Sequence, residues 1–138
     1  MNHKFNSGKI SILLAEDDLI NQKVFELMVH WLGHSIDIAG NGKVAVEKFI
    51  QKDYNIIFMD ISMPVMSGLD AAKAIRTIER NRNTEEMVKI IAYTTNNQPD
   101  FAATCQLSGM DGILIKPLSL NKLEGMIKML HPHLSLHD

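Results

Sequence analysis

The sequence has little of several features that mark particular classes of protein. One cysteine, Cys105, occurs among its 138 residues, so no internal disulfide can form. No apolar run approaches the roughly 18 residues that a membrane-spanning helix needs, so we expect no integral membrane segment. The formal net charge is −2, without the clear excess of Lys and Arg that non-specific nucleic-acid binding requires. These absences leave one small domain with neither a membrane nor a nucleic acid as its expected partner.

The two ends of the chain also lack structural signals. Residues 1–8 are polar, without the apolar stretch of a secretory signal, and we expect a disordered tail there. We expect one folded domain over residues 9–132 and a second tail at 133–138. A single cysteine and no signal segment together favour the reducing cytoplasm as the location.

The sequence does contain a regular alternation of short apolar runs and longer amphipathic segments. The short runs predict strands at 10–15, 35–39, 54–59, 88–94 and 112–115. Apolar residues at three- and four-residue steps predict helices at about 20–31, 43–51, 69–79, 99–108 and 120–130. The apolar stripe of the first helix consists of Ile20, Val24, Leu27, Met28 and Trp31. We expect this stripe to face the core, with Trp31 buried.

The order of these elements, strand then helix five times over, indicates the architecture. Three of the strands are apolar at nearly every position, which is typical of parallel strands covered by helices on both faces. Parallel neighbours need crossover connections, which are almost always right-handed. We therefore predict an α/β fold, a doubly wound five-stranded parallel sheet of the flavodoxin-like (βα)5 type with strand order 2-1-3-4-5. Ligands of such sheets bind beyond the carboxyl ends of the strands.

Polar residues stand at that end of four of the predicted strands. They are Glu16, Asp17 and Asp18 after the first strand, Asp60 after the third, Thr94 at the end of the fourth and Lys116 after the fifth. The topology allows these side chains to converge on one cleft. Carboxylates that lie close together repel one another unless a cation lies between them. Mg²⁺ suits such a site because it prefers oxygen ligands and is usually held by only a few carboxylates.

A cation, a hydroxyl, a lysine and a carboxylate together suit phosphoryl transfer. The metal and the ammonium neutralise charge on the transferred group, the hydroxyl donates to it, and a carboxylate oxygen attacks in line. Asp60 is the candidate nucleophile because it follows the central strand. Singly, the residues have simpler explanations: Asp18 as the cap of the next helix, Thr94 as a strand residue, and Lys116 as a surface lysine. Their coincidence at one end of the sheet favours a functional site.

Four separated stretches of the chain resemble the motifs of a response-regulator receiver domain of two-component signalling. They are Ile12-Leu13-Leu14-Ala15-Glu16-Asp17-Asp18, Met59-Asp60-Ile61-Ser62-Met63-Pro64-Val65-Met66-Ser67-Gly68, Ile90-Ile91-Ala92-Tyr93-Thr94, and Gly109-Met110-Asp111-Gly112 leading to Lys116-Pro117. The resemblance covers about residues 9–130. In many members of the family the peptide bond before the proline at the position of Pro117 is cis.

The resemblance implies a set of roles for the residues at the strand ends. Asp60 would accept a phosphoryl group from a phosphohistidine, and Thr94 and Lys116 would contact the phosphoryl oxygens. The ligands implied for Mg²⁺ are Glu16, Asp17, Asp60 and the backbone carbonyl of Ser62. The implied partners are a histidine kinase or a histidine phosphotransfer protein, together with a downstream effector protein. The run 17–24 is similar to the receivers of hybrid histidine kinases.

The sequence also departs from the usual receiver pattern. Ile113 stands where many receivers carry an aromatic residue that swings inward when the threonine moves. Thr95 stands after Thr94, where Ala or Ser is common. The two variable positions that tune hydrolysis of the acyl phosphate in the family correspond to Ser62 and Asn96.

Other functions remain as alternatives. A haloacid-dehalogenase-like phosphatase would carry a second acid two residues after the nucleophile, where this chain has Ser62. A flavin or nucleotide site would need an anion-binding loop after the first strand, where Glu16 and Asp17 stand instead. A non-phosphorylated receiver-like scaffold would not need the full set of site residues. Our expectation is self-phosphorylation from a phosphodonor with slow autodephosphorylation, read by another protein because no output domain is expected after Leu130.

Overall fold

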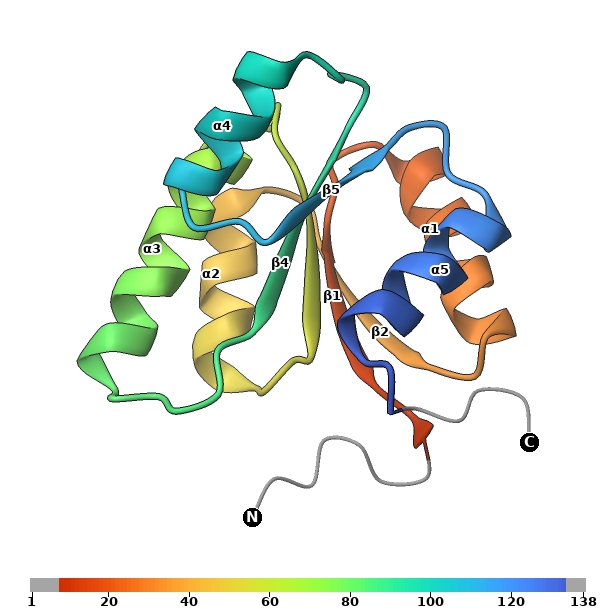
Figure 1. Cartoon of the computed structure of the whole chain (residues 1–138), viewed down its shortest axis with the longest axis horizontal. Coiled ribbons are helices and arrows are strands. Elements are labelled where there is room, and N and C mark those ends of the chain that lie inside the picture. The colour runs from red at the N-terminus through yellow and green to blue at the C-terminus, as the bar shows by residue number, and fades with distance from the viewer. Residues whose placement is uncertain (1–7, 134–138) are drawn as a thin grey trace.

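A computed structural model of the chain describes residues 8–133, in which five strands alternate with five helices (Figure 1). The elements are β1 (Ser11–Ala15), α1 (Leu19–Trp31), β2 (Ser35–Ala39), α2 (Gly42–Gln51), β3 (Ile56–Asp60), α3 (Gly68–Asn81), β4 (Lys89–Thr94), α4 (Pro99–Leu107), β5 (Gly112–Ile115) and α5 (Leu120–Leu130). The predicted elements agree with these bounds to within two residues. Apart from residues 8 and 133, the predicted tails at 1–8 and 133–138 lie outside the described residues, so the domain limits at 9 and 132 stay predictions.

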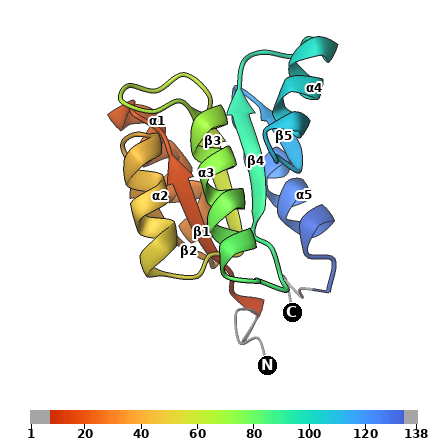
Figure 2. The same ribbon diagram turned by 90° about the vertical axis from the view of Figure 1, so that its left-hand side faces the viewer.

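The strands form one parallel sheet in the order β2-β1-β3-β4-β5, which confirms the predicted topology. Helices α2, α3 and α4 cover one face of the sheet, and α1 and α5 cover the other (Figures 1 and 2). Among residues 8–133, none of the helices combines the length and the apolar character that a membrane crossing requires.

Side-chain alternation along the strands divides the core into two layers. In β1, Ile12 and Leu14 pack on the α1 and α5 side, whereas Leu13 and Ala15 pack on the α2 and α3 side. Strand β3 lies in the middle of the sheet and is buried at all five positions, which explains its continuous apolar run. Fully burying an Ile, Leu or Phe side chain contributes about 1.5–3 kcal/mol. The two layers hold the strand ends, and hence the polar residues that follow them, in fixed positions.

The buried face predicted for α1 was wrong. Phe25 and Val29 face the sheet, whereas Ile20, Leu27 and Trp31 are 75%, 61% and 78% exposed. The helix has apolar residues around most of its circumference, so three- and four-residue spacing alone could not decide which stripe meets the core. The helix therefore has a second apolar face, which is directed outward.

Candidate functional site

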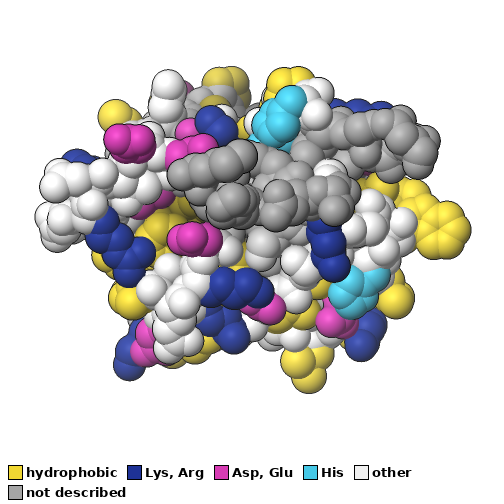
Figure 3. Space-filling model, turned by 90° about the horizontal axis from the view of Figure 1, so that it is seen from below, with side chains coloured by type: hydrophobic (Ala, Val, Ile, Leu, Met, Phe, Trp, Pro, Cys, Tyr) yellow, Lys and Arg dark blue, Asp and Glu magenta, His cyan; other side chains and the backbone are white. Residues whose placement is uncertain are grey.

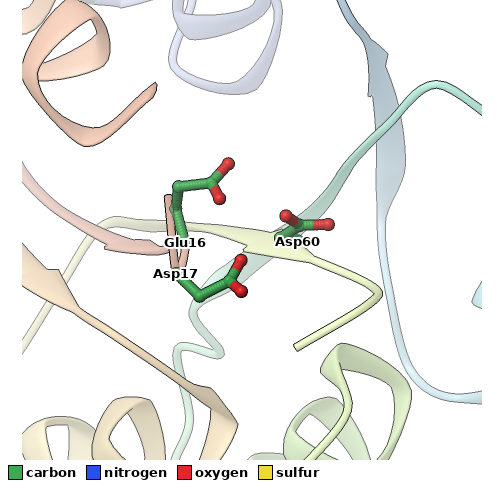
Figure 4. Close-up of side chains that lie close together, drawn as sticks. All are labelled: Glu16, Asp17 and Asp60. Atoms are coloured by element: carbon green, nitrogen blue, oxygen red, sulfur yellow. The ribbon is translucent and has the colours of Figure 1, made fainter. Parts of the chain in front are cut away.

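The three carboxylates predicted to meet do so where β1 and β3 end. Glu16, Asp17 and Asp60 each place one carboxylate oxygen within 4.8 Å of the others. Figure 4 shows Glu16 and Asp17 leaving the end of β1 beside Asp60 on β3. The exposed fractions of Glu16 and Asp60 are 1% and 8%, whereas Asp17 is exposed. Oxygen donors of this kind are those that a hard divalent cation such as Mg²⁺ prefers.

Lys116 brings a positive charge into this cluster from the end of β5. Its Nζ atom donates to Oε1 of Glu16 at 3.2 Å and to Oδ2 of Asp60 at 3.3 Å. Burial lowers the pKa of Lys116, but attraction to Asp60 and then to Glu16 outweighs burial, so the pKa is raised overall. The peptide bond between Lys116 and Pro117 is cis. The cluster therefore holds three carboxylates and one ammonium, which contacts Glu16 and Asp60, and this leaves an excess of negative charge.

Glu16 is the carboxyl group of the cluster that water reaches least. Burial raises its pKa, and the nearby Asp60 charge raises it further. A hydrogen bond from the backbone N–H of Asp18, 2.9 Å from Oε2, and the Lys116 ammonium act in the opposite direction. The net effect is a raised pKa, because the ionised form of Glu16 is not fully compensated by its neighbours. A further cation would supply that compensation.

Asp18 serves the helix rather than the cluster. Its Oδ1 atom accepts hydrogen bonds from the backbone N–H groups of Ile20 and Asn21 at 2.8 and 3.0 Å. These bonds satisfy two donors at the start of α1, which is the predicted capping role. The cap begins α1 directly after the carboxylates, so the exposed apolar face of this helix starts beside the site.

Thr94 and Ser62 lie at the same edge of the sheet. Thr94 ends β4, is 8% exposed, and accepts a hydrogen bond from the backbone N–H of Asn96 at 3.1 Å. The backbone N–H of Ser62 donates to Oδ1 of Asp60 at 3.3 Å, so the loop after β3 folds back on the carboxylate. The roles of Thr94 and of the Ser62 carbonyl stay predictions. Ile113 is partly buried and packs against the core cluster on the α2, α3 and α4 side.

Two further residues, Gly68 and Tyr93, shape this site through contacts that the sequence alone does not reveal. Gly68 closes the loop after β3, and a Cβ atom on it would collide with the carbonyl oxygen of Asp60. Tyr93 precedes Thr94, and its ring centroid lies 4.7 Å from Nζ of Lys116. The available sequence signal was the position of Tyr93, one residue before the polar end of a strand adjacent to β3.

Comparison with known proteins places the chain in a family. The profile of the response regulator receiver domain matches residues 12–128. The chain is 33% identical over 139 residues to Histidine kinase 5 of Arabidopsis thaliana, with 85% of this chain and 15% of that protein aligned. It is 35% identical over 119 residues to the aerobic respiration control sensor protein ArcB of Escherichia coli, with 86% and 15% aligned. The chain thus spans about a sixth of the length of these curated relatives.

Solved structures agree with the sequence relatives. The receiver domain of sensor histidine kinase PA1611 from Pseudomonas aeruginosa, with magnesium coordinated in its active-site cleft, is 33% identical with a TM-score of 0.78. That match covers 88% of this chain and 97% of the other. A chain of the complex between the Saccharomyces cerevisiae phosphotransfer protein Ypd1 and the Ssk1 receiver domain is 32% identical, with a TM-score of 0.86 and 94% of both chains covered. With its topology, its motifs and these matches in agreement, the chain belongs to the family of response regulator receiver domains.

Proposed function

We propose that this receiver domain accepts a phosphoryl group on Asp60 with the help of Mg²⁺, and thereby acts in two-component or phosphorelay signalling. The observation that carries the proposal is the meeting of Glu16, Asp17 and Asp60 within 4.8 Å of one another, with the Lys116 ammonium 3.3 Å from Asp60. The receiver family favours this function over the phosphatase, nucleotide-binding and scaffold alternatives. The cytoplasmic location stays a prediction.

The side chains divide the chemistry among them. Glu16, Asp17 and Asp60, with the backbone carbonyl of Ser62, would hold Mg²⁺, which supplies positive charge to the transferred group when bound. A carboxylate oxygen of Asp60 attacks phosphorus and forms the new O–P bond, while the bond to the donor's imidazole nitrogen breaks and that nitrogen keeps the electron pair. The Lys116 ammonium then pairs with a phosphoryl oxygen, and the Thr94 hydroxyl donates to another.

The outer face of α1 favours a helical phosphohistidine protein as the donor. This face is made of Leu19, Ile20, Val24, Leu27 and Trp31, all more than 40% exposed. Hydrophobic side chains also stand out at the α1 side of the molecule in Figure 3, next to a surface on which both signs of charge are mixed. Exposed apolar patches of this kind mark interaction sites.

The same face is continuous with the reaction site. Val24 and Asn21 of α1 line a hollow of about 390 Å³ together with Lys116 and Tyr93. A helix laid along α1 would therefore bring a histidine near its first turn close to Asp60. The matched chain of the yeast complex comes from a structure with a histidine phosphotransfer protein, which supports a protein of that class, or a histidine kinase, as the partner.

Acetyl phosphate is a suitable probe of the acceptor function. The full chain is incubated with acetyl phosphate and Mg²⁺, and intact mass spectrometry is expected to find one added phosphoryl group. Asp60→Asn should abolish the adduct, and chelation of Mg²⁺ should prevent it. The matched control is Asp53→Asn, an exposed aspartate at the opposite end of β3, which should be modified like the wild type. Absence of an adduct on the wild type, or an undiminished adduct on Asp60→Asn, would rule out the proposal.

A further inference from the structure

Lys116 rests on an aromatic ring that is itself held rigidly. The Nζ atom of Lys116 lies 4.7 Å from the ring centroid of Tyr93. Tyr93 is 5% exposed, and its ring meets that of Phe25 edge to face, with centroids 5.2 Å apart. Phe25 in turn packs on Phe58 with a centroid separation of 5.0 Å. Phe58 is thus one ring further from the ammonium than Phe25. Because Tyr93 itself is buried and held by Phe25, the surface beneath the ammonium is fixed.

The register of the sheet explains why this ring lies beside the acceptor. Tyr93 pairs with Asp60 across β3 and β4, and with Leu114 across β4 and β5. Side chains two residues apart share a face of the sheet, so Lys116 follows Leu114 on the face that carries Tyr93. Glu16 has the same relation to Leu14 in β1. The ammonium is therefore bounded by two carboxylates and by one aromatic ring.

These neighbours limit how the ammonium can be oriented. An ammonium has three N–H donors, and two of those of Lys116 point to Glu16 and Asp60. A cation is attracted to the face of an aromatic ring, more strongly where water is excluded. Lysine has a flexible four-carbon stem, so without such a surface the ammonium would sample other positions. The ring thus favours the position from which Lys116 can exchange Asp60 for a phosphoryl oxygen with little movement.

We propose that Tyr93 is a positioning residue that orients Lys116 for phosphoryl transfer to Asp60, an inference that rests on the proposed function. The aromatic face, rather than the phenolic hydroxyl, performs this role. Burial raises the pKa of the Tyr93 phenol, so the ring carries no negative charge that would form an additional ion pair. A phenylalanine at position 93 should therefore still orient Lys116, whereas an aliphatic residue of similar apolar character should not.

The test compares three variants of the full chain. Tyr93→Leu should slow Mg²⁺-dependent phosphorylation by acetyl phosphate by roughly 3- to 10-fold, the range expected for loss of one partly desolvated cation–π contact. Tyr93→Phe should stay within about twofold of the wild type. Phe58→Leu is the matched control, because it removes a buried ring of the same aromatic cluster that is not in contact with Lys116. The control should also stay within about twofold. Mg²⁺ affinity should be the same in all three, since none changes a proposed ligand.

A second measurement reads the position of Lys116 without any phosphoryl donor. In the chain labelled with ¹⁵N-lysine, the Lys116 ammonium signal should shift in Tyr93→Leu and stay in place in Phe58→Leu. Equal slowing by Tyr93→Leu and Phe58→Leu would show a merely structural role, and equal slowing by Tyr93→Leu and Tyr93→Phe would assign the effect to the hydroxyl. Either result overturns the inference. If the wild type takes up no phosphoryl group, the proposed function fails, and an unshifted Lys116 signal in Tyr93→Leu would separately refute the positioning contact.

Discussion

Two clusters in this domain each combine a basic side chain with carboxylates, and they differ in how completely their polar atoms are paired. In the Arg76 cluster, formed by Arg76, Glu79 and Asp111, the guanidinium donates to Glu79 at 2.7 Å and to Asp111 at 2.8 Å. It also donates to the backbone carbonyls of Gly109 and Val88, each at 2.8 Å. This one side chain therefore links α3 to β4 and to the turn before β5.

The carboxylates of the Arg76 cluster are paired as well. Glu79 accepts from the backbone N–H of Val88 at 2.8 Å, and Asp111 accepts from that of Ile90 at 2.9 Å. The buried charges of Arg76 and Glu79 thus each have both an opposite charge and a backbone partner, which is the condition under which buried ions are tolerated. A cluster completed in this way stabilises one arrangement of the chain and offers little to a ligand.

The cluster at Asp60 is incomplete by the same criteria. Lys116 makes longer contacts, 3.2 and 3.3 Å, to only two of the three carboxylates, one of which, Glu16, is 1% exposed. Burial raises the pKa of Glu16, and ionisable groups shifted in a cluster with excess charge are typical of functional sites. The degree of pairing, rather than the number of charges, therefore separates the structural Arg76 cluster from the cluster proposed to react.

The largest expected effect breaks the structural cluster. Arg76→Met leaves Glu79 and Asp111 without their cation, and we expect the free energy of unfolding to fall by about 3–5 kcal/mol. Urea denaturation at neutral pH measures the change. Arg80→Met, on the exposed side of α3, is the matched control and should change stability by less than about 0.5 kcal/mol. A loss below about 1 kcal/mol in Arg76→Met would mean that this cluster does not stabilise the fold as described.

The next effect concerns the cluster at Asp60. It should appear in the rate of phosphorylation rather than in the free energy of unfolding. Lys116→Met removes the ammonium that we propose pairs with the transferred group, and phosphorylation by acetyl phosphate should slow by about 10²- to 10³-fold. The loss of stability should be smaller than for Arg76→Met, because the proposed Mg²⁺ would still neutralise the carboxylates. Lys73→Met, an exposed lysine on α3, should leave both quantities unchanged. The distinction between the clusters fails if Lys116→Met unfolds the domain as severely as Arg76→Met does.

The smallest expected effect lies outside both clusters, at the buried His131. Burial, followed by the charges of His133 and Lys89, lowers the pKa of His131 to about 4 from its usual 6.5. The unfolded chain therefore takes up this proton first, so stability provided by neutral His131 is present above pH 6.5 and is lost as the pH falls toward 4. The expected slope is about 1.4 kcal/mol per pH unit in this window.

His131→Gln should flatten this acid dependence, as measured by urea denaturation between pH 7 and 5. The exposed His30 offers a control, since His30→Gln should retain the wild-type slope. An unchanged slope in His131→Gln would show that His131 is not the source of the acid dependence.

Much of the fold and of the site could be predicted because both follow from local patterns. The apolar run of β3 and the polar residues after each strand place Asp60, Lys116 and Glu16 at one edge once the sheet is parallel. The Arg76 cluster could not be predicted, since Arg76 and Asp111 are 35 positions apart and each looks like a surface charge in the sequence. Hydrophobic spacing within one segment predicts a helix or strand, whereas ion pairs depend on contacts between distant segments.

The errors have the same physical origin. Trp31 was expected in the core because α1 has apolar residues on two faces, and only the packed sheet selects the face with Phe25. The contact of Tyr93 with Lys116 joins two strands through the sheet register, which no spacing within one segment reveals.

Locating the phosphoryl group on the chain decides whether the incomplete cluster is the reactive one. After incubation with Mg²⁺ and acetyl phosphate, borohydride reduces an aspartyl phosphate to homoserine, which peptide mass spectrometry can place in the sequence. We predict homoserine at position 60 and at no other aspartate. Homoserine at Asp111, in the fully paired Arg76 cluster, or at Asp17, or a chain without any homoserine, would contradict the assignment of Asp60 as the phosphoryl acceptor.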